Sequence, residues 1–419
     1  MEKYSIAFLC HFSNAIIRER LNLKNLSLRR FFLSKKGITS VYDDFAIWVS
    51  DYISEFEKHP EIEFHIVSPH FGLKKKNQSF ALNGIHYHFF KYRCGFLYSC
   101  LNKLFHIEEK QRFRQNRKKI RLIVNQIEPD LIVLCGAENP YYSIGVLDIK
   151  NKPIYVILQT LLNDQKRINM GVGSSFRRKI EIEIFRHALY FCVSNEKAVA
   201  KIKEVNHKAV ILPAGFPTHR TYIVLPKKKE YDFVFFARGV TKYKGIEDLL
   251  QAFSIVKKSH SKINLCIIGI CAKEYKKHLN SVMEQLAIKD NVHFAGYYEN
   301  LTDVFVNVAK AKVVVVPGIT AGLNSTVRES MIMGMPTICY ETPATQQINR
   351  EETCLLTAPM NDVKALAYQM QISLEHPSQI EQIAANGKVY ADREFSNEAI
   401  VNRMIKNIVK ILKYENCDK

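Results

Sequence analysis

The chain has 419 residues, of which 47% are hydrophobic and 24% are charged, and its net charge is +19. This balance is typical of a globular protein with two or three domains. No stretch reaches the roughly 18 uninterrupted apolar residues of a membrane-spanning helix. The ten cysteines are scattered without a C-x-x-C pair, so we predict a reduced cytoplasmic protein with no metal site.

The positive charge is concentrated in the first half of the chain. Residues 1–228 carry a net charge of +17, whereas residues 229–419 carry +2. Such an excess attracts anionic partners, namely nucleic acid, acidic lipid headgroups or phosphorylated substrates. The alternative is a solvated basic surface that keeps the protein soluble.

Short apolar runs alternate with helical patterns in the first half. We predict strands at Tyr4–Cys10, Glu63–Val67, Ile85–Phe90 (as part of a hairpin), Asp130–Cys135, Pro153–Leu158, Leu189–Val193 and Ala209–Leu212. We predict helices at Tyr42–Phe56, Ile180–His187 and Asn195–Val205. This alternation indicates a parallel, doubly wound sheet.

A second set of alternating elements follows the polar linker Tyr222–Glu230. Its predicted strands are Phe233–Ala237, Leu265–Ile268, Val292–Phe294, Lys312–Val316 and Thr337–Tyr340. Its predicted helices are Gly245–Val256, Asn361–Glu375, Gln379–Arg393 and Glu398–Tyr414. We therefore predict two α/β domains, 1–225 and 226–395, that face each other across a cleft, with 396–419 as a C-terminal helix crossing back to the first domain.

Two cations follow the first strand of the second domain. Arg238 and Lys244 lie six residues apart, across the strand end and the first helical turn. A guanidinium and an ammonium group that approach a pyrophosphate from two directions would neutralise it and would stabilise a departing nucleoside diphosphate. The alternative is that both side chains lie in a solvated loop.

A second candidate site lies at 322–329, where a strand ends in a turn and a helix begins. Gly322, Leu323 and Asn324 offer free backbone N–H groups that suit a phosphate or sugar hydroxyl groups. Ser325 and Thr326 would add donors, or would act only as N-caps. Glu329, one helical turn further on, would accept hydrogen bonds from the two hydroxyl groups of a ribose; the alternative is an acid that only stabilises the first helical turn.

Several ordered motifs now give a resemblance. They are Phe236-Ala-Arg238 with Lys244-Gly245, Val292-His-Phe-Ala-Gly296, and Pro317-Gly followed by Ala321-Gly-Leu-Asn and Glu329-Ser-Met-Ile-Met-Gly334-Met-Pro336. Val193-Ser194 and Leu212-Pro-Ala-Gly215 add two landmarks in the first half. Together they resemble the retaining glycosyltransferases of the GT-B fold, often numbered family 4. The resemblance is strong from about 190 to 370 and weak before 125.

The resemblance implies two Rossmann-like domains and a sugar transfer with retention. The donor would be a nucleotide-diphosphate sugar, and Gly269 and Tyr297 would join the residues that bind it. The acceptor would be a glycan or a lipid-linked saccharide of bacterial surface polysaccharide synthesis. No cofactor and no metal ion are expected, because Arg238 and Lys244 supply the positive charge.

The chain departs from the family pattern at three places. Ala321 replaces the first glutamate of the E-x7-E pair, and Gln159 stands where the family has a histidine near the sugar. A double-glycine loop is absent after the first strand, where His11, Asn14 and Arg18 stand instead. Ala321 leaves the sugar specificity open, and we assign His11, Asn14, Arg18 and Gln159 to a reshaped acceptor side. The alternative function is a catalytically silent relative that binds a nucleotide or glycan as a regulatory or scaffold subunit.

Glu138 and Asn139 follow a strong predicted strand and are expected to face the cleft. Glu138 is the candidate for orienting or deprotonating the acceptor hydroxyl group. The alternative is that both residues begin the next helix as caps. His11 is interpreted as a loop or core residue more readily than as a catalyst.

A basic helix follows an apolar segment in the first domain. Residues 96–105 are largely apolar, and the next stretch carries Arg114, Arg117, Lys118 and Arg121. This pattern suits peripheral docking on the anionic inner face of a membrane, or else an ordinary solvated helix. A third function, association with RNA or DNA, is not favoured, because the chain has no recognised nucleic-acid reader motif.

Overall fold

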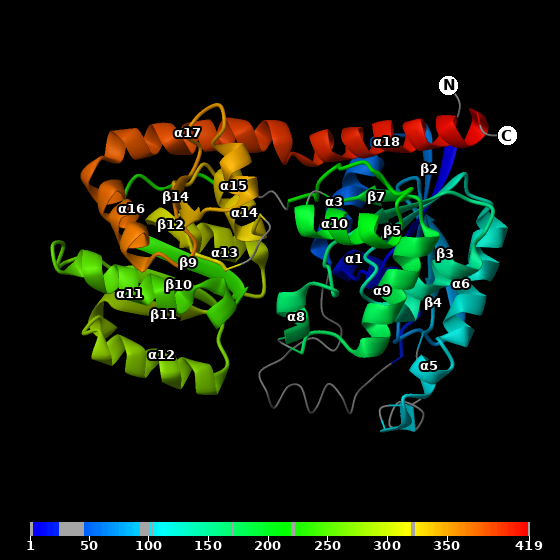
Figure 1. Cartoon of the computed structure of the whole chain (residues 1–419), viewed down its shortest axis with the longest axis horizontal. Helices are drawn as coiled ribbons and strands as arrows, with labels where there is room; N and C mark the ends of the chain where they lie inside the picture. The colour runs from blue at the N-terminus through cyan, green and yellow to red at the C-terminus, as the bar shows by residue number, and fades with distance from the viewer. Residues whose placement is uncertain are drawn as a thin grey trace. The chain divides into compact units, whose positions relative to one another are not determined.

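The computed structural model describes residues 3–24, 46–92, 101–102, 104–169, 171–193, 195–218, 223–319 and 323–417. The chain divides into two compact units (Figure 1). Unit 1 contains Met1–Pro217 and Asn397–Lys419, and unit 2 contains Thr218–Ser396.

Unit 1 is built on one eight-stranded sheet in the order β3-β4-β2-β1-β5-β6-β7-β8. The strands are β1 (Tyr4–Leu9), β2 (Ile62–Pro69), β3 (Asn77–Leu82), β4 (Ile85–Phe90), β5 (Leu131–Cys135), β6 (Ile154–Ile157), β7 (Tyr190–Cys192) and β8 (Val210–Ile211). Every pairing is parallel except that of β3 with β4. The predicted hairpin is thus confirmed, and its two-residue turn is Asn83-Gly84, both at positive φ, a pair favoured in such turns.

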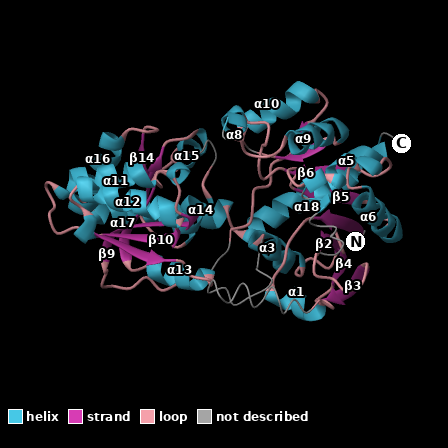
Figure 2. Cartoon of the chain, turned by 90° about the horizontal axis from the view of Figure 1, so that it is seen from below, coloured by secondary structure: helices cyan, strands magenta, loops and turns pink. Residues whose placement is uncertain are grey.

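Helices cover both faces of this sheet (Figure 2). They are α1 (Ala15–Arg20), α3 (Ile47–Phe56), α5 (Ile107–Lys110), α6 (Arg114–Ile127), α7 (Pro140–Ser143), η1 (Ile144–Asp148), α8 (Gln165–Asn169), α9 (Ser175–His187), α10 (Glu196–Val205) and α18 (Asn397–Cys417). Alternate residues of β1 enter different cores: Phe8 packs on the side of α3 and α18, and Leu9 on the side of α6 and α9. This alternation follows from the two-residue period of a strand.

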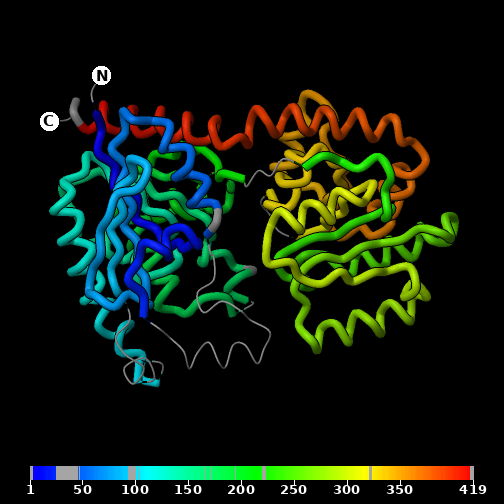
Figure 3. The backbone as a smooth tube through the Cα atoms, turned by 180° about the vertical axis from the view of Figure 1, so that it is seen from behind, coloured from blue at the N-terminus to red at the C-terminus, as the bar shows by residue number. Residues whose placement is uncertain are grey.

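The C-terminal helix α18 is anchored to unit 1 by polar side chains. Asn407 Nδ2 donates to the Tyr155 hydroxyl at 3.0 Å and to the Leu212 carbonyl at 3.1 Å, and Arg403 Nε donates to the Ala214 carbonyl at 3.2 Å. The far end of α18 lies beside the start of β1 (Figure 3). Residues 397–417 therefore complete the first core although they come last in the chain.

Unit 2 is built on six parallel strands in the order β11-β10-β9-β12-β13-β14. They are β9 (Tyr231–Gly239), β10 (Leu265–Ile270), β11 (Val292–Gly296), β12 (Ala311–Val316), β13 (Thr337–Tyr340) and β14 (Leu356–Ala358). The helices are α11 (Ile246–Lys257), α12 (Lys273–Gln285), α13 (Leu301–Val308), α14 (Ser325–Ile332), α15 (Pro343–Ile348), α16 (Val363–Glu375) and α17 (Pro377–Glu394), with 3-10 turns η2 (Lys242–Lys244) and η3 (Lys289–Asn291). Because β9 and β12 are neighbours, the loops at their carboxyl ends lie next to each other.

Candidate functional site

The loops after β9 and β12 are joined through their backbones. Ile319 N donates to the Tyr243 carbonyl at 3.0 Å. Gly245 has φ +74°, and a Cβ atom placed on it would lie 1.8 Å from the Pro317 carbonyl oxygen. Only glycine combines this conformation with such a close approach. The Lys244-Gly245 pair therefore brings the first predicted motif against the second.

Lys244 and Glu329 are the charged side chains that this junction brings together. Burial lowers the pKa of Lys244, and the Glu329 carboxylate opposes that shift. Both side chains are half-buried, whereas Arg238 at the end of β9 is exposed. A partly desolvated ammonium group interacts with an anion more strongly than a fully hydrated one does. This corner of unit 2 can accordingly hold an anionic ligand.

Helix α14 begins where we predicted, but its cap is a different residue. Asn324 is the N-cap, and its Oδ1 accepts from Thr326 N at 3.3 Å. Ser325 and Thr326, which we considered as caps, are instead the first two residues of the helix. Ser325 is exposed and Thr326 is buried. Asn324 Nδ2 is buried and has no hydrogen-bond partner among the residues that the structure describes. Gly322, and with it Thr320 and Ala321, lies outside the described residues.

The other predicted nucleotide-binding residues follow the remaining strands. Gly269 is the last residue but one of β10 and has φ +143°; a Cβ atom on it would lie 2.1 Å from the Ala237 carbonyl oxygen. This glycine allows β10 to lie close against the end of β9. Tyr297 follows the edge strand β11 and is half exposed. Leu323 is half-buried and packs on the core beside β12.

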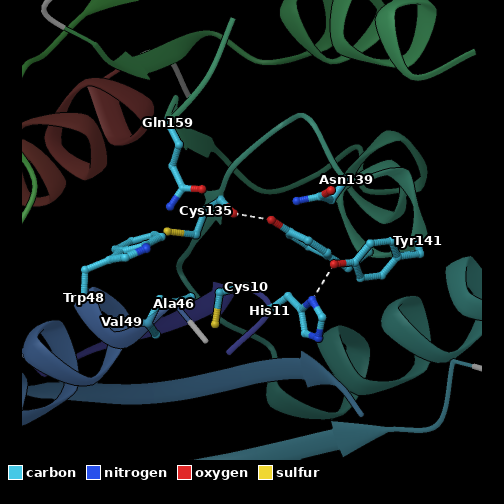
Figure 4. Close-up of a pocket in the computed structure, with 10 residues that line it drawn as sticks. Cys10, His11, Ala46, Trp48, Val49, Cys135, Asn139, Tyr141 and Gln159 are labelled. Carbon is cyan, nitrogen blue, oxygen red and sulfur yellow. Dashed lines mark hydrogen bonds between the residues drawn. The ribbon is translucent and has the colours of Figure 1, made fainter. Parts of the chain in front are cut away.

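Unit 1 contains a pocket at the carboxyl ends of β1, β5 and β6 (Figure 4). Its volume is about 240 Å³, and it lies between the start of α3 and the start of α7. The lining residues are Cys10, His11, Ala46, Trp48, Val49, Cys135, Asn139, Tyr141, Tyr142 and Gln159. Three predicted acceptor-side residues, His11, Asn139 and Gln159, are thus brought together here.

Glu138, which we expected to face a cleft, lies buried behind this pocket. Its side chain is 7% exposed, because Gly136 turns the chain at φ +88° and the carboxylate folds back over it. Burial raises the pKa of Glu138 to about 7; the Glu181 carboxylate adds to the shift, and Arg177 and Arg167 oppose it.

Two amides of the pocket wall contact the same carboxylate oxygen. Asn139 Nδ2 donates to Glu138 Oε1 at 3.3 Å. Gln159 donates to Oε1 at 3.0 Å and accepts from Trp48 Nε1 at 3.3 Å, with its amide oriented so that both atoms are paired. Glu138 Oε2 has no hydrogen-bond partner among the described residues. Asn139 is the N-cap residue of α7, as the alternative interpretation expected, but its side chain makes no cap hydrogen bond.

The other acceptor-side predictions have local structural partners. Asn14 Oδ1 caps α1 by accepting from Ile17 N at 2.9 Å, and Arg18 donates to the Ser13 hydroxyl at 3.0 Å. His11 Nδ1 hydrogen-bonds the Tyr141 hydroxyl. Neither Asn14 nor Arg18 lines the pocket.

Sequence reasoning missed Trp48 as a pocket residue, because its helical spacing with Val49 and Tyr52 indicates a core position. The one signal in the sequence for a functional role of Trp48 was that it is the only tryptophan of the chain. Among the described residues, no group of three or more His, Cys, Asp or Glu side chains is arranged to hold a metal ion.

Replacing Glu138 by glutamine is expected to stabilise the protein at alkaline pH. An acid whose pKa is raised in the folded state loses stability as the pH rises from about 4.5 to above 7. The loss amounts to about 3 kcal/mol at pH 8. Glu138→Gln should therefore melt several degrees above the wild type at pH 8 and at nearly the same temperature at pH 5.

The matched control for this melting experiment is Glu183→Gln. The Arg112 guanidinium lowers the pKa of Glu183 through a side-chain hydrogen bond, so this variant should be less stable than the wild type at pH 8. If Glu138→Gln also lowers the melting temperature at pH 8, then the ionised Glu138 carboxylate stabilises the folded protein, and its pKa is not raised by burial.

Comparison with known proteins gives a family match for unit 2. Residues 222–390 match the family of glycosyl transferases group 1. A relative from Haemophilus influenzae, described as an uncharacterized glycosyltransferase, is 21% identical over 313 residues, which is 72% of this chain and 82% of the relative.

Solved structures show the same fold over nearly the whole chain. Sucrose-phosphate synthase from Thermosynechococcus elongatus superposes with a TM-score of 0.68 at 15% identity, covering 98% of this chain and 100% of that one. HepE from Anabaena, in complex with UDP and glucose, superposes with a TM-score of 0.63 at 13% identity, covering 97% and 100%. The predicted fold class, two Rossmann-like α/β domains of the GT-B type, is confirmed.

Proposed function

We propose that this protein transfers a sugar, with retention, from a nucleotide-diphosphate sugar to a carbohydrate acceptor. The match of residues 222–390 to the family of glycosyl transferases group 1 supports this proposal. Lys244 and the exposed Arg238 bind the diphosphate. Glu329 and the N-terminus of α14 bind the ribose and the neighbouring phosphate. The observation that carries the proposal is the half-buried Lys244 ammonium beside Glu329, fixed by the contact of Gly245 with Pro317.

Two features support a nucleoside diphosphate as the leaving group. The solved structures of HepE and of TarM from S. aureus contain UDP. In this chain, the half-buried Lys244 ammonium is available to neutralise such a group, whereas Thr326 N, Val327 N and Arg328 N at the start of α14 already donate to Asn324. We extend the acceptor class to a glycan or lipid-linked saccharide of bacterial surface polysaccharide, as the family resemblance implies.

A donor screen tests the proposed function. The intact chain is incubated with UDP-, GDP- and ADP-sugars, without acceptor, and release of the free sugar is followed by NMR. Slow hydrolysis of one donor, with the sugar first appearing in the anomeric configuration of the donor, is expected. Thermal stabilisation by a nucleotide without any turnover would instead support the alternative of a silent binding subunit.

The membrane surface that we propose for the acceptor side is formed by exposed residues of α5, α6 and the segment before them. Leu104 is 74% exposed, Phe105 52% and Leu122 54%. Arg114, Lys118 and Arg121 are exposed on α6. Residues 93–100 and 103 of the predicted segment lie outside the described residues. None of the described helices is long and apolar enough to cross a bilayer.

One of the four basic residues predicted to contact the membrane, Arg117, is not available for that contact. Arg117 Nε donates to Asp148 Oδ2 at 2.9 Å, so its charge is already paired. We expect the triple variant Arg114→Gln, Lys118→Gln, Arg121→Gln to bind anionic vesicles about 100-fold more weakly, at roughly 1 kcal/mol per residue. Co-sedimentation with phosphatidylglycerol vesicles measures this.

The control removes the same charge elsewhere in unit 1. Lys74, Lys75 and Lys76 are exposed and adjacent, and their replacement by glutamine should leave vesicle binding nearly unchanged. Equal losses in both triple variants would show that net charge alone drives the association and would refute a docking surface on α6.

A further inference from the structure

The pocket of unit 1 is lined by aromatic rings and amides. Trp48, Tyr141 and Tyr142 provide the aromatic walls, and Asn139 and Gln159 provide the amides (Figure 4). No carboxylate, lysine or arginine is among the described residues that line it. A charged ligand would therefore lose its hydration without gaining a counter-charge. The lining selects an uncharged ligand that can form hydrogen bonds.

The pocket is small. Its volume of about 240 Å³ lies below the roughly 300–1,000 Å³ that holds a drug-sized molecule. It has room for a single six-membered ring with its substituents, but not for a nucleotide. The ligand of this pocket is therefore distinct from the nucleoside diphosphate proposed for unit 2.

The two amides are held in fixed positions. Gln159 is bonded to Glu138 and to Trp48 Nε1, and Asn139 is bonded to Glu138 and to Arg177. Each amide keeps a second N–H group and a second oxygen lone pair available for a ligand. Preorganised groups of this kind bind without losing further side-chain entropy.

The indole of Trp48 is also held in place. Its ring forms T-shaped pairs with the rings of Tyr52, at a centroid distance of 6.0 Å, and Phe216, at 5.7 Å. The electron-rich face of such a ring attracts the weakly positive C–H groups that a sugar ring presents on its less polar face. A rigid aromatic wall beside two amides can thus contact both the C–H face and the hydroxyl groups of one sugar.

We propose that this pocket binds a single uncharged pyranose ring, the terminal sugar of the acceptor, with Trp48 against its C–H face and Asn139 and Gln159 bonded to its hydroxyl groups. Glu138 is a positioning residue, because it holds both amides from behind. The proposal rests on the glycosyltransferase function and specifies the acceptor class as a neutral saccharide. Uronic acids, amino sugars with a free ammonium group and phosphorylated sugars are excluded.

The single tryptophan allows a direct binding test. The intrinsic fluorescence of the full-length protein is titrated with neutral methyl glycosides of glucose, galactose and N-acetylglucosamine, in the absence of donor. Saturation-transfer NMR of the same glycosides is the second measurement. At least one neutral glycoside should bind saturably by both methods. Methyl glucuronide and glucosamine should bind at least tenfold more weakly.

Variants assign the binding to the two amides. Asn139→Ala and Gln159→Ala should each weaken glycoside binding about tenfold, which corresponds to roughly 1.4 kcal/mol for one lost hydrogen bond. Gln165→Ala, on the exposed surface of α8, is the matched control and should bind as the wild type does. Circular dichroism confirms that each variant is folded.

Three results would overturn the proposal. They are the absence of glycoside binding by both methods, a preference for charged sugars, and competition by a nucleotide sugar alone, which would assign the pocket to the transferred sugar. Donor hydrolysis is measured separately without glycoside. A protein that binds glycosides but turns over no donor would therefore refute the proposed function and leave the pocket assignment standing. A protein that hydrolyses a donor but binds no glycoside would refute the pocket assignment and leave the proposed function standing.

Discussion

Replacing Lys244 by alanine is expected to lower the rate of sugar transfer about 10²–10³-fold, the usual effect of removing one group that stabilises a developing negative charge. As the glycosidic bond breaks, the departing diphosphate gains charge, and the half-buried ammonium is positioned to neutralise it. The melting temperature should not fall, because burial already disfavours this charge in the folded protein and lowers its pKa.

The matched control is Lys242→Ala, two residues earlier in the same 3-10 turn. Lys242 is exposed, so its loss should change the turnover rate less than threefold. Turnover and melting temperature are measured for both variants with the donor that the screen identifies. If Lys244→Ala keeps a rate within threefold of the wild type, the ammonium group takes no part in the reaction.

The second large effect is expected from Gly245→Ala. The new methyl group would lie 1.8 Å from the Pro317 carbonyl oxygen, and the residue would have to keep a φ of +74°. Overpacking and backbone strain together should destabilise unit 2 by about 3 kcal/mol. The loops after β9 and β12 would have to separate, and a displacement of about 1 Å is enough to lower catalysis 100-fold.

Gly334→Ala is the control for this substitution. Gly334 also lies in unit 2 at positive φ, +70°, but the nearest atom to its new Cβ would be the flexible Lys388 Cδ at 3.2 Å. This variant should lose only about 1 kcal/mol, from backbone strain, and should bind nucleotide normally. Equal nucleotide affinity in Gly245→Ala and Gly334→Ala would show that the Gly245–Pro317 contact does not organise the site.

The strands were predictable because continuous apolar runs such as Val313–Val316 are typical of buried parallel strands. The strand β14 was missed because its three residues, Leu356–Ala358, are too few to form a pattern. The short helix α8 was missed for the same reason, and α7 was considered only as an alternative.

The candidate site was predictable in its residue types and not in its geometry. The direction of the Glu138 side chain depends on the positive φ of Gly136, which the sequence pattern does not reveal. The pairing of Arg117 with Asp148 joins residues far apart in the chain. Trp48 lines a pocket although its spacing indicates a core position. In each case a tertiary contact, which no local pattern encodes, decides the role of the side chain.

Calorimetric titration of the intact chain with UDP, GDP and ADP tests the central claim most directly. We expect saturable binding of at least one nucleoside diphosphate, at least tenfold weaker in Lys244→Ala and unchanged in Lys242→Ala. The account would be contradicted if none of the three nucleotides bound, or if the best of them bound equally well to the wild type and to Lys244→Ala.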